Sequence, residues 1–262
     1  MSPKIRLGLV LWIAGFTGIA SVLLLDFEAL LALLPESARE GNPRITPAIK
    51  LLGLVQPAAI LTLAVFGGVT LTPKVGLSAP AVEAWAAGRP VLPALRPQWL
   101  PGVLGGLGGG LAILLIAALT HPWLPPGAAA SISTFSRLMP FVTRLLYGGI
   151  TEELLLRWGL MTLLAWGCWR MFQKHRARPP GLCFHGAILL SAAVFGAGHL
   201  PVAFLVVPEP NFALVAFVLL ANAAFGVIAG YLFWKRGLES AIAAHMVTHV
   251  VLLAASRLGV YF

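Results

Sequence analysis

Acidic residues are scarce in this chain: nine Asp and Glu occur among 262 residues, and charged residues of both signs make up only 10% of the total. A soluble globular protein is about one quarter charged, so this composition excludes an ordinary soluble domain. Hydrophobic residues make up 59% of the chain instead. Because a membrane-spanning helix needs roughly 20 apolar residues, the composition predicts an all-α polytopic membrane helix bundle.

Cysteine is also rare, and the spacing of Cys168 and Cys183, the two in the chain, fits no metal-binding or redox motif. Between them lies the basic segment RMFQKHRARPPGL. This segment is expected to face the cytoplasm, where thiols stay reduced. The sequence therefore predicts two incidental, unpaired thiols.

Positive charge, in contrast, is in excess: eighteen Lys and Arg give a formal net charge of +9. In a soluble protein this balance would suggest a nucleic-acid partner. Here the basic residues lie mainly between apolar runs, so we interpret them as signals for membrane orientation and expect no nucleic acid.

The apolar runs predict about seven spans, and the basic residues fall on alternate connections between them. The positive-inside rule places that side, with the N-terminus, in the cytoplasm and the C-terminus outside. The opposite side carries fewer basic residues, among them Arg39 and Arg44, which Glu36 and Glu40 partly offset. The basic bias fits a multi-pass protein of a bacterial inner membrane. The predicted spans lie near residues 7–27, 48–72, 99–120, 141–168, 184–206, 211–234 and 239–260.

The chain divides by content rather than by a folded boundary. Residues 1–140 are predicted to form an N-terminal transmembrane region with interfacial loops at 73–100 and 120–140, and residues 141–262 carry the polar motifs. The apolar run after Lys4 and Arg6 resembles a signal peptide but is long for a cleavable one. We therefore expect a retained signal anchor.

The segment GGITEELLLRWGL, residues 148–160, places three charges inside an apolar run. A charge at the bilayer centre costs about 3 kcal/mol on insertion scales. On a helix Glu153 and Arg157 are i and i+4 and can pair, which a purely structural ion pair would explain. Glu152 points about 100° away and cannot use that arginine so well. A carboxylate left partly unpaired in an apolar bundle suits a general acid/base.

Histidines form two further clusters. His199 follows Phe195 at i+4 in VFGAGHLP, and Pro201 predicts a bend or helix end just past it. His245 and His249 in AIAAHMVTHVV are also i and i+4, so both imidazoles can reach one centre, either a metal ion or a substrate carbonyl. A lone intramembrane histidine more often makes a structural hydrogen bond, but these clusters together indicate a site.

Other polar or small residues in the spans have structural interpretations. For Asn222, a hydrogen bond between helices is favoured over a role in the site. Gly226 and Gly230 form a GxxxG face for packing, and Thr248 can bond back to its own helix. The glycine-rich run at 102–112 indicates close helix packing rather than phosphate binding, because no Walker-type lysine follows.

The order EExxxR, FxxxH, GYLFWKRGLESAIAAH and HxxxH resembles the CPBP family, which takes in the CAAX prenyl proteases, the bacteriocin-processing or self-immunity proteins and the Abi proteins. The resemblance covers residues 140–255 and implies an all-α intramembrane protease with its active site inside the bundle. By position it implies that Glu152 activates water with the assistance of His199, that His245 and His249 stabilise the oxyanion, and that Glu153 and Arg157 support the site.

The last motif position departs from the family pattern, in which Asn or Asp is usual and this chain has His249. A neutral histidine can donate one hydrogen bond to an oxyanion. It also adds a third imidazole beside His199 and His245, and three histidines with a nearby carboxylate are an acceptable zinc set. Catalysis without a cofactor and catalysis with a divalent metal such as zinc both stay open.

The predicted function is hydrolysis of a peptide bond in a membrane-embedded or lipid-anchored substrate, such as a prenylated C-terminus, a leader peptide or a C-terminal sorting helix. A transporter or channel for protons or metal ions is an alternative, and it requires a polar path across the full membrane. A non-catalytic scaffold or immunity protein is another, and it predicts the loss of a motif. The polar residues gather at one level and a single motif position departs, which favours the protease.

Overall fold

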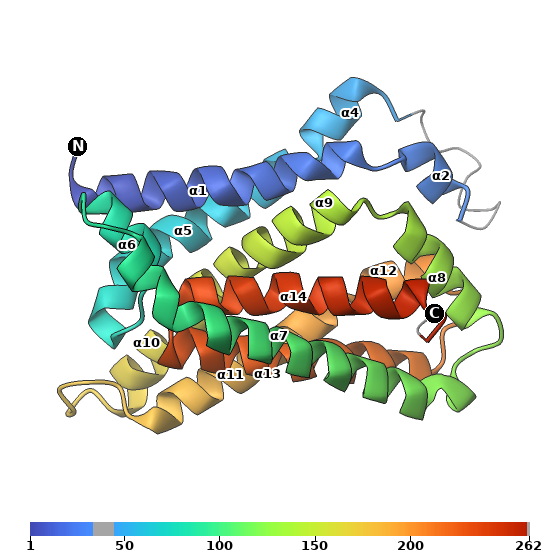
Figure 1. The fold of residues 1–262 in the computed structure, drawn as a ribbon. Helices are drawn as coiled ribbons and strands as arrows, with labels where there is room; N and C mark the ends of the chain where they lie inside the picture. Colours follow the sequence, from blue (N-terminus) through green and yellow to red (C-terminus); the bar gives the residue numbers. More distant parts are fainter. Residues whose placement is uncertain (34–44, 261–262) are drawn as a thin grey trace.

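The computed structural model describes residues 1–33 and 45–260, in which long helices run back and forth along one direction (Figure 1). No strand occurs in this part of the chain, so the predicted all-α class is confirmed. In chain order the elements are α1 (Pro3–Ser21), η1 (Val22–Leu24), α2 (Phe27–Leu31), α4 (Pro47–Leu52), α5 (Val55–Val75), α6 (Pro80–Ala86), α7 (Leu92–Thr120), η2 (His121–Trp123), α8 (Ala128–Leu138), α9 (Phe141–Thr143), η3 (Arg144–Glu152), η4 (Leu154–Met161), α10 (Thr162–Phe172), α11 (Gly181–Gly198), α12 (Leu200–Val206), α13 (Phe212–Lys235) and α14 (Leu238–Arg257).

Local sequence signals set the ends of several helices. The Ser2 hydroxyl accepts a hydrogen bond from the first turn of α1, where Pro3 fits because its missing N–H needs no partner. The Asn211 side chain caps α13 in the same way. Gly76 ends α5 in the left-handed conformation, with φ at 78°, which glycine adopts without a steric cost.

Six helices in the described ranges are long and apolar enough to cross a membrane. A seventh passage is the helical stretch 141–172, formed by α9, η3, η4 and α10, which carries the charged side chains of Arg144, Glu152, Glu153 and Arg157 before its last helix. The prediction of about seven spans is consistent with this arrangement. The six spans are Pro3–Leu24, Pro47–Val75, Leu92–Trp123, Gly181–Val206, Phe212–Lys235 and Leu238–Arg257.

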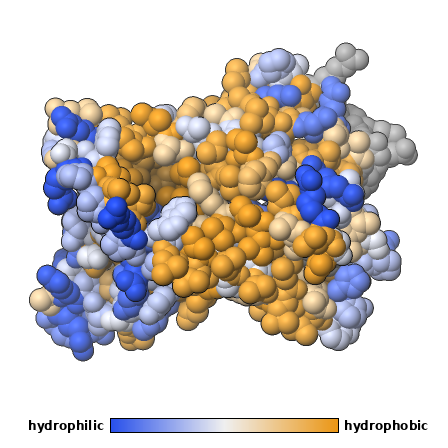
Figure 2. All heavy atoms as spheres, in the orientation of Figure 1, coloured by the Kyte–Doolittle hydropathy of each residue, from blue (hydrophilic) through white to orange (hydrophobic). Residues whose placement is uncertain are grey.

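The surface follows the same pattern, because apolar side chains cover the middle of the bundle and hydrophilic ones gather at its two ends (Figure 2). The start of α1 and the ends of α5, α10 and α13 share one end, so the basic residues beside them lie together there (Figure 1). We call this the basic end. Glu36, Glu40, Arg39 and Arg44, which enter the predicted charge balance, lie outside the described residues.

The glycine-rich run in α7 packs against α14, as predicted. A Cβ on Gly102 would lie 2.8 Å from Ala243 Cβ, and one on Gly106 would lie 2.5 Å from the Ala244 carbonyl oxygen. Such distances leave no room for a side chain, so the two backbones approach closely. The Thr248 hydroxyl donates to the Gly106 carbonyl at 3.0 Å. The prediction that Thr248 bonds within its own helix is therefore wrong, because the bare glycine surface brings an acceptor within reach.

The N-terminal helices form one wall around the stretch 141–172. The Thr151 hydroxyl donates to the Gly15 carbonyl of α1 at 2.7 Å, and the Trp158 indole donates to the Val65 carbonyl of α5 at 3.1 Å. A side chain at Gly18 would collide with Thr151. Helices α1 and α5 therefore hold this stretch from one side.

The two connectors predicted as interfacial loops contain more helix than expected. Between 73 and 100 the predicted short helix is present as α6, but α7 begins at Leu92 rather than near 99. The 120–140 connector contains helix α8. Three apolar residues of this connector, Ile132, Phe135 and Met139, recur at helical spacing and line a cavity in the bundle. Helix α8 also contacts α12. This packing stabilises a helix in a segment whose prolines suggested a loop.

Cys168 and Cys183 form a disulfide between α10 and α11, with their Cα atoms 5.5 Å apart. The prediction of unpaired thiols is wrong. The short basic connector makes α10 and α11 antiparallel neighbours, and this brings the two residues to the same level. Their spacing along the chain could not indicate the pairing, because it depends on how the two helices pack.

Candidate active site

Glu152 ends the π-helix η3, and Glu153 lies between it and the next π-helix, η4. In a π-helix the backbone N–H bonds to the carbonyl five residues earlier. Two threonine side chains follow the same register, since Thr162 Oγ1 donates to the Arg157 carbonyl at 3.2 Å and Thr151 Oγ1 approaches the Leu146 carbonyl at 3.4 Å. The prediction assumed an ordinary α-helix here. π-Helical turns are frequent at functional sites, where they turn side chains toward a centre that an α-helix would not reach.

Glu153 is buried and bridges two helices. Its Oε2 lies 3.2 Å from Arg157 Nε, as the i, i+4 spacing predicts, although the two atoms are not aligned as a hydrogen bond. Its Oε1 lies 2.8 Å from Nδ1 of His245 on α14. A carboxylate only accepts, so Nδ1 carries the proton and donates. Glu153 therefore fixes the orientation of His245 as well as balancing the charge of Arg157.

Arg157 is fully buried and has two further partners. Its Nη2 donates to the Gly226 carbonyl at 3.3 Å, and its guanidinium lies 5.1 Å from the centre of the Phe195 ring. These contacts connect η4 to α13 and α11. Gly226 also packs against α11, where a Cβ would lie 2.8 Å from Ala192 Cβ, so the predicted packing role of this glycine is confirmed.

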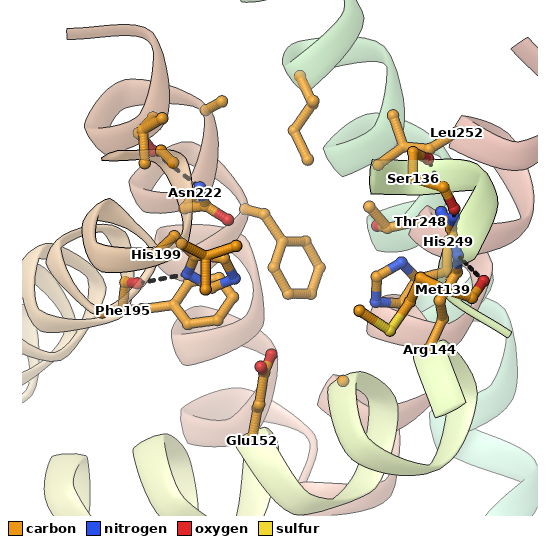
Figure 3. Close-up of a pocket in the computed structure, with 18 of the residues that line it drawn as sticks. Ser136, Met139, Arg144, Glu152, Phe195, His199, Asn222, Thr248, His249 and Leu252 are labelled. Atoms are coloured by element: carbon orange, nitrogen blue, oxygen red, sulfur yellow. Dashed lines mark hydrogen bonds between the residues drawn. The ribbon is translucent and has the colours of Figure 1, made fainter. Parts of the chain in front are cut away.

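Glu152 points elsewhere, into the cavity (Figure 3). Its Oε2 lies 3.8 Å from His245 Nε2, and 19% of its side chain is accessible. Arg157 pairs with Glu153 and not with Glu152 in the described chain, as predicted. The two adjacent glutamates therefore have different environments: Glu153 is enclosed and Glu152 is open to whatever enters the cavity.

His199 marks a break between two helices, as Pro201 predicts. Helix α11 ends at Gly198 and α12 begins at Leu200. The His199 Nδ1 lies 2.8 Å from the Phe195 carbonyl. Since that oxygen can only accept, Nδ1 carries the proton, and the neutral ring has an unprotonated Nε2 as an acceptor. His199 lines the same cavity as Glu152 (Figure 3).

His245 and His249 lie on one face of α14, as predicted, with their rings stacked 5.0 Å apart. Both ring nitrogens of His249 are buried and have no hydrogen-bond partner within the described residues. The ring fits against the glycine pair of η3, where a Cβ on Gly148 would lie 2.5 Å from His249 Nε2. Buried polar atoms nearly always find partners, so this ring is placed to bond a group that none of the described residues supplies.

The cavity has a volume of about 500 Å³ and is lined mainly by α8, η3, α12, α13 and α14, with further residues from α7, α9 and α11. Glu152, His199, His245 and His249 line it, whereas Glu153 and Arg157 lie behind the wall. Four of the six predicted site residues therefore line the cavity. The other two, Glu153 and Arg157, lie behind it, where Glu153 orients His245. Most of the remaining lining is apolar and includes Ile113, Phe135, Val202, Val206 and Phe217.

Arg144 and Asn222 line the cavity but were not among the predicted site residues, although Asn222 was considered and assigned to a hydrogen bond between helices. Arg144 lies near the cavity wall formed by α8, donating through Nη2 to the backbone and hydroxyl oxygens of Ser136 and through Nε to the Met139 carbonyl. Asn222 also lines the cavity. Its signal in the sequence was its isolation, since no other hydrogen-bonding side chain occurs between Phe212 and Tyr231.

The three imidazoles do not form a metal site as arranged. No group of three or more His, Cys, Asp or Glu side chains in residues 1–33 and 45–260 is placed to hold a metal ion. His199 and His249 stand on opposite sides of the cavity (Figure 3). The Nδ1 atoms of His199 and His245 are bonded to a carbonyl and a carboxylate, so each ring has only its Nε2 left for a metal. Because the described donors do not converge on one point, the arrangement does not fit a zinc ion.

Taken together, these features define a polytopic membrane protein with a carboxylate and several histidines facing a cavity inside its helix bundle, the side-chain types of a hydrolytic site. Residues 134–251 match the family model described as "Rce1-like: Type II CAAX prenyl endopeptidase Rce1-like". This part of the chain is therefore an Rce1-like domain of the CPBP family, and the resemblance found in the sequence is confirmed. The match supports a membrane endopeptidase in general terms. No curated protein and no solved structure matches the chain significantly.

Proposed function

We propose that this protein is an intramembrane endopeptidase that hydrolyses a peptide bond in a membrane-embedded or lipid-anchored substrate. One observation carries the proposal: of two adjacent glutamates, Glu153 is buried and used by Arg157 and His245, while Glu152 faces a cavity lined by histidines. A carboxylate shielded from bulk solvent and free of a tight partner is suited to remove a proton from water.

In the proposed reaction Glu152 accepts a proton from a water molecule whose oxygen attacks the carbonyl carbon of the substrate. The unprotonated Nε2 of His199 accepts the other hydrogen of that water and holds it in place. When the tetrahedral intermediate collapses, the carbon–nitrogen bond breaks and Glu152 returns its proton to the departing amine. The step is balanced, because one water is consumed and a carboxylic acid and an amine are produced.

The negative oxygen of the intermediate needs donors. His249 can supply one N–H, because neither of its ring nitrogens is committed within the described chain. Because Nδ1 of His245 is committed to Glu153, this ring can supply a second donor, from Nε2, only when both of its nitrogens carry a proton.

We propose that the basic end faces the cytoplasm, as the positive-inside rule requires, in a bacterial inner membrane. The cavity is lined by α8, α12 and the start of η3, which lie away from the basic end, so substrates would approach from the opposite leaflet. The Cys168–Cys183 disulfide argues for the reverse orientation, because the cytoplasm keeps thiols reduced. Labelling of single introduced cysteines at Lys4 and at Arg137 with an impermeant reagent decides between the two.

The test of the function compares the N- and C-termini of membrane proteins in cells that express the wild type or Glu152→Gln. Termini that occur only with the wild type, at equal protein levels, would identify the substrate together with the activity. If no terminus differs although both proteins are folded, the protease proposal is wrong. A proton or metal-ion flux that Glu152→Gln abolishes in vesicles would then favour the transporter alternative.

A further inference from the structure

Asn222 places a polar group on an otherwise apolar wall of the cavity. Helix α13 contributes Phe217, Val218, Ala221, Asn222 and Phe225 to the lining. An amide inside a membrane span costs free energy unless both its donor and its acceptor find partners. Asn222 therefore needs a partner for its Nδ2 donor and a partner for its Oδ1 acceptor.

The orientation of the amide is set by its own helix. Asn222 Nδ2 lies 2.8 Å from the Val218 carbonyl oxygen. A carbonyl only accepts, so the atom facing it must be the nitrogen, and Oδ1 points the other way, into the cavity (Figure 3). The prediction that Asn222 bonds a neighbouring helix is wrong, and its Oδ1 has no bond to any described residue.

His199 faces the same cavity from the junction of α11 and α12 (Figure 3). Its Nδ1 is committed to the Phe195 carbonyl, so the neutral ring also presents an acceptor to the cavity. Two acceptors cannot bond each other. One is satisfied by the water that Glu152 activates in the proposed reaction, and the other needs a donor from the substrate.

The main-chain N–H is the one donor that every peptide presents at each non-proline residue. We propose that Asn222 Oδ1 accepts a main-chain N–H of the substrate beside the scissile bond and so sets which carbonyl faces Glu152. The inference rests on the proposed protease function. It makes Asn222 a substrate-binding residue that acts without regard to the side chains of the substrate.

The experiment uses the full-length enzyme in detergent and synthetic peptides that span a terminus found to depend on Glu152. In one series of peptides each main-chain N–H is replaced in turn by an ester oxygen, which deletes the donor and leaves the shape. Asn222→Leu removes the acceptor at similar volume. Ser191→Ala is the matched control, because that buried hydroxyl also bonds its own helix, at 3.1 Å, but does not line the cavity.

Asn222→Leu should raise KM about tenfold for the all-amide peptide, the loss expected for one hydrogen bond of about 1.4 kcal/mol. For one ester peptide the variant and the wild type should be alike, since the bond is already missing. An unchanged KM, or an equal loss on every ester peptide, would overturn the role of Asn222 and leave the protease intact. If no cleavage depends on Glu152, the protease proposal fails first and the role of Asn222 fails with it.

Discussion

His245 Nδ1 lies 2.8 Å from Glu153 Oε1, so a histidine on the last helix is oriented by a glutamate 92 residues earlier. The same carboxylate lies beside the Arg157 guanidinium. Its neighbour Glu152 faces the cavity instead. Two adjacent residues of the same type are thus separated into one that holds the site together and one that is open to a substrate.

This separation predicts different effects for two conservative substitutions. Glu153→Gln should leave the buried Arg157 without a counter-charge, which costs about 3–5 kcal/mol of stability, and should lower kcat at least about 100-fold, because His245 loses the partner that orients it. Glu152→Gln should abolish cleavage while leaving the thermal unfolding midpoint close to that of the wild type. Equal stability of the two variants would contradict the role of Glu153.

Gly148 provides a second prediction, because a Cβ there would lie 2.5 Å from His249 Nε2. Gly148→Ala should displace that ring, reduce activity, and destabilise the fold by about 1–3 kcal/mol through overpacking. Gly167→Ala is the matched control, since a Cβ at Gly167 meets no atom within 4 Å. It should be neutral or stabilising by about 0.5–1 kcal/mol. Thermal unfolding and kcat of both variants check this, and similar behaviour of the two would show that His249 does not depend on the glycine.

His249 itself is tested by its replacements. His249→Leu should lower kcat by about 10²–10³-fold if the ring donates to the oxyanion. His249→Asn keeps a donor, and Asn is a usual residue at this position in the family that the motifs resemble, so its kcat should stay within about tenfold of the wild type. Steady-state cleavage by the purified variants measures the difference. Equal losses in both would rule out a donor role.

Removal of metal ions is predicted to leave the activity unchanged, because the donor set of the cavity does not fit zinc. The measurement is cleavage before and after treatment with a strong chelator, together with the metal content of the purified protein. Loss of activity that zinc alone restores would show that the histidines rearrange around an ion.

The disulfide gives a prediction on stability. Cys168 and Cys183 are separated by 15 residues, and closing a loop of that length stabilises a fold by about 3 kcal/mol in the chain-entropy account. A double Cys168→Ser, Cys183→Ser variant should therefore unfold at a lower temperature than the oxidised wild type. The reduced wild type should behave like the variant. Intact-mass measurement after thiol alkylation checks that the oxidised protein has no free cysteine.

The sequence could predict features that depend on residues close together in the chain, and it could not predict those that depend on packing between distant segments. The Glu153–Arg157 pair, the shared face of His245 and His249 and the helix end at His199 depend on short spacings along one helix, and all three are present. The bond between Glu153 and His245 joins two helices far apart in the chain, so no spacing could indicate it. The π-helical register and the disulfide depend on packing in the same way.

The packing of α1 against the stretch 141–172 has a consequence for the order of synthesis. Gly15 of α1 emerges from the ribosome 136 residues before Thr151, whose hydroxyl its carbonyl accepts. During that interval α1 and α5 can pack against each other, through contacts such as the hydrogen bond from Trp12 to Thr62, but the surface that later contacts the stretch 141–172 has no protein partner. The site can close only after the later helices arrive, so insertion and assembly are separate stages in the biogenesis of this protein.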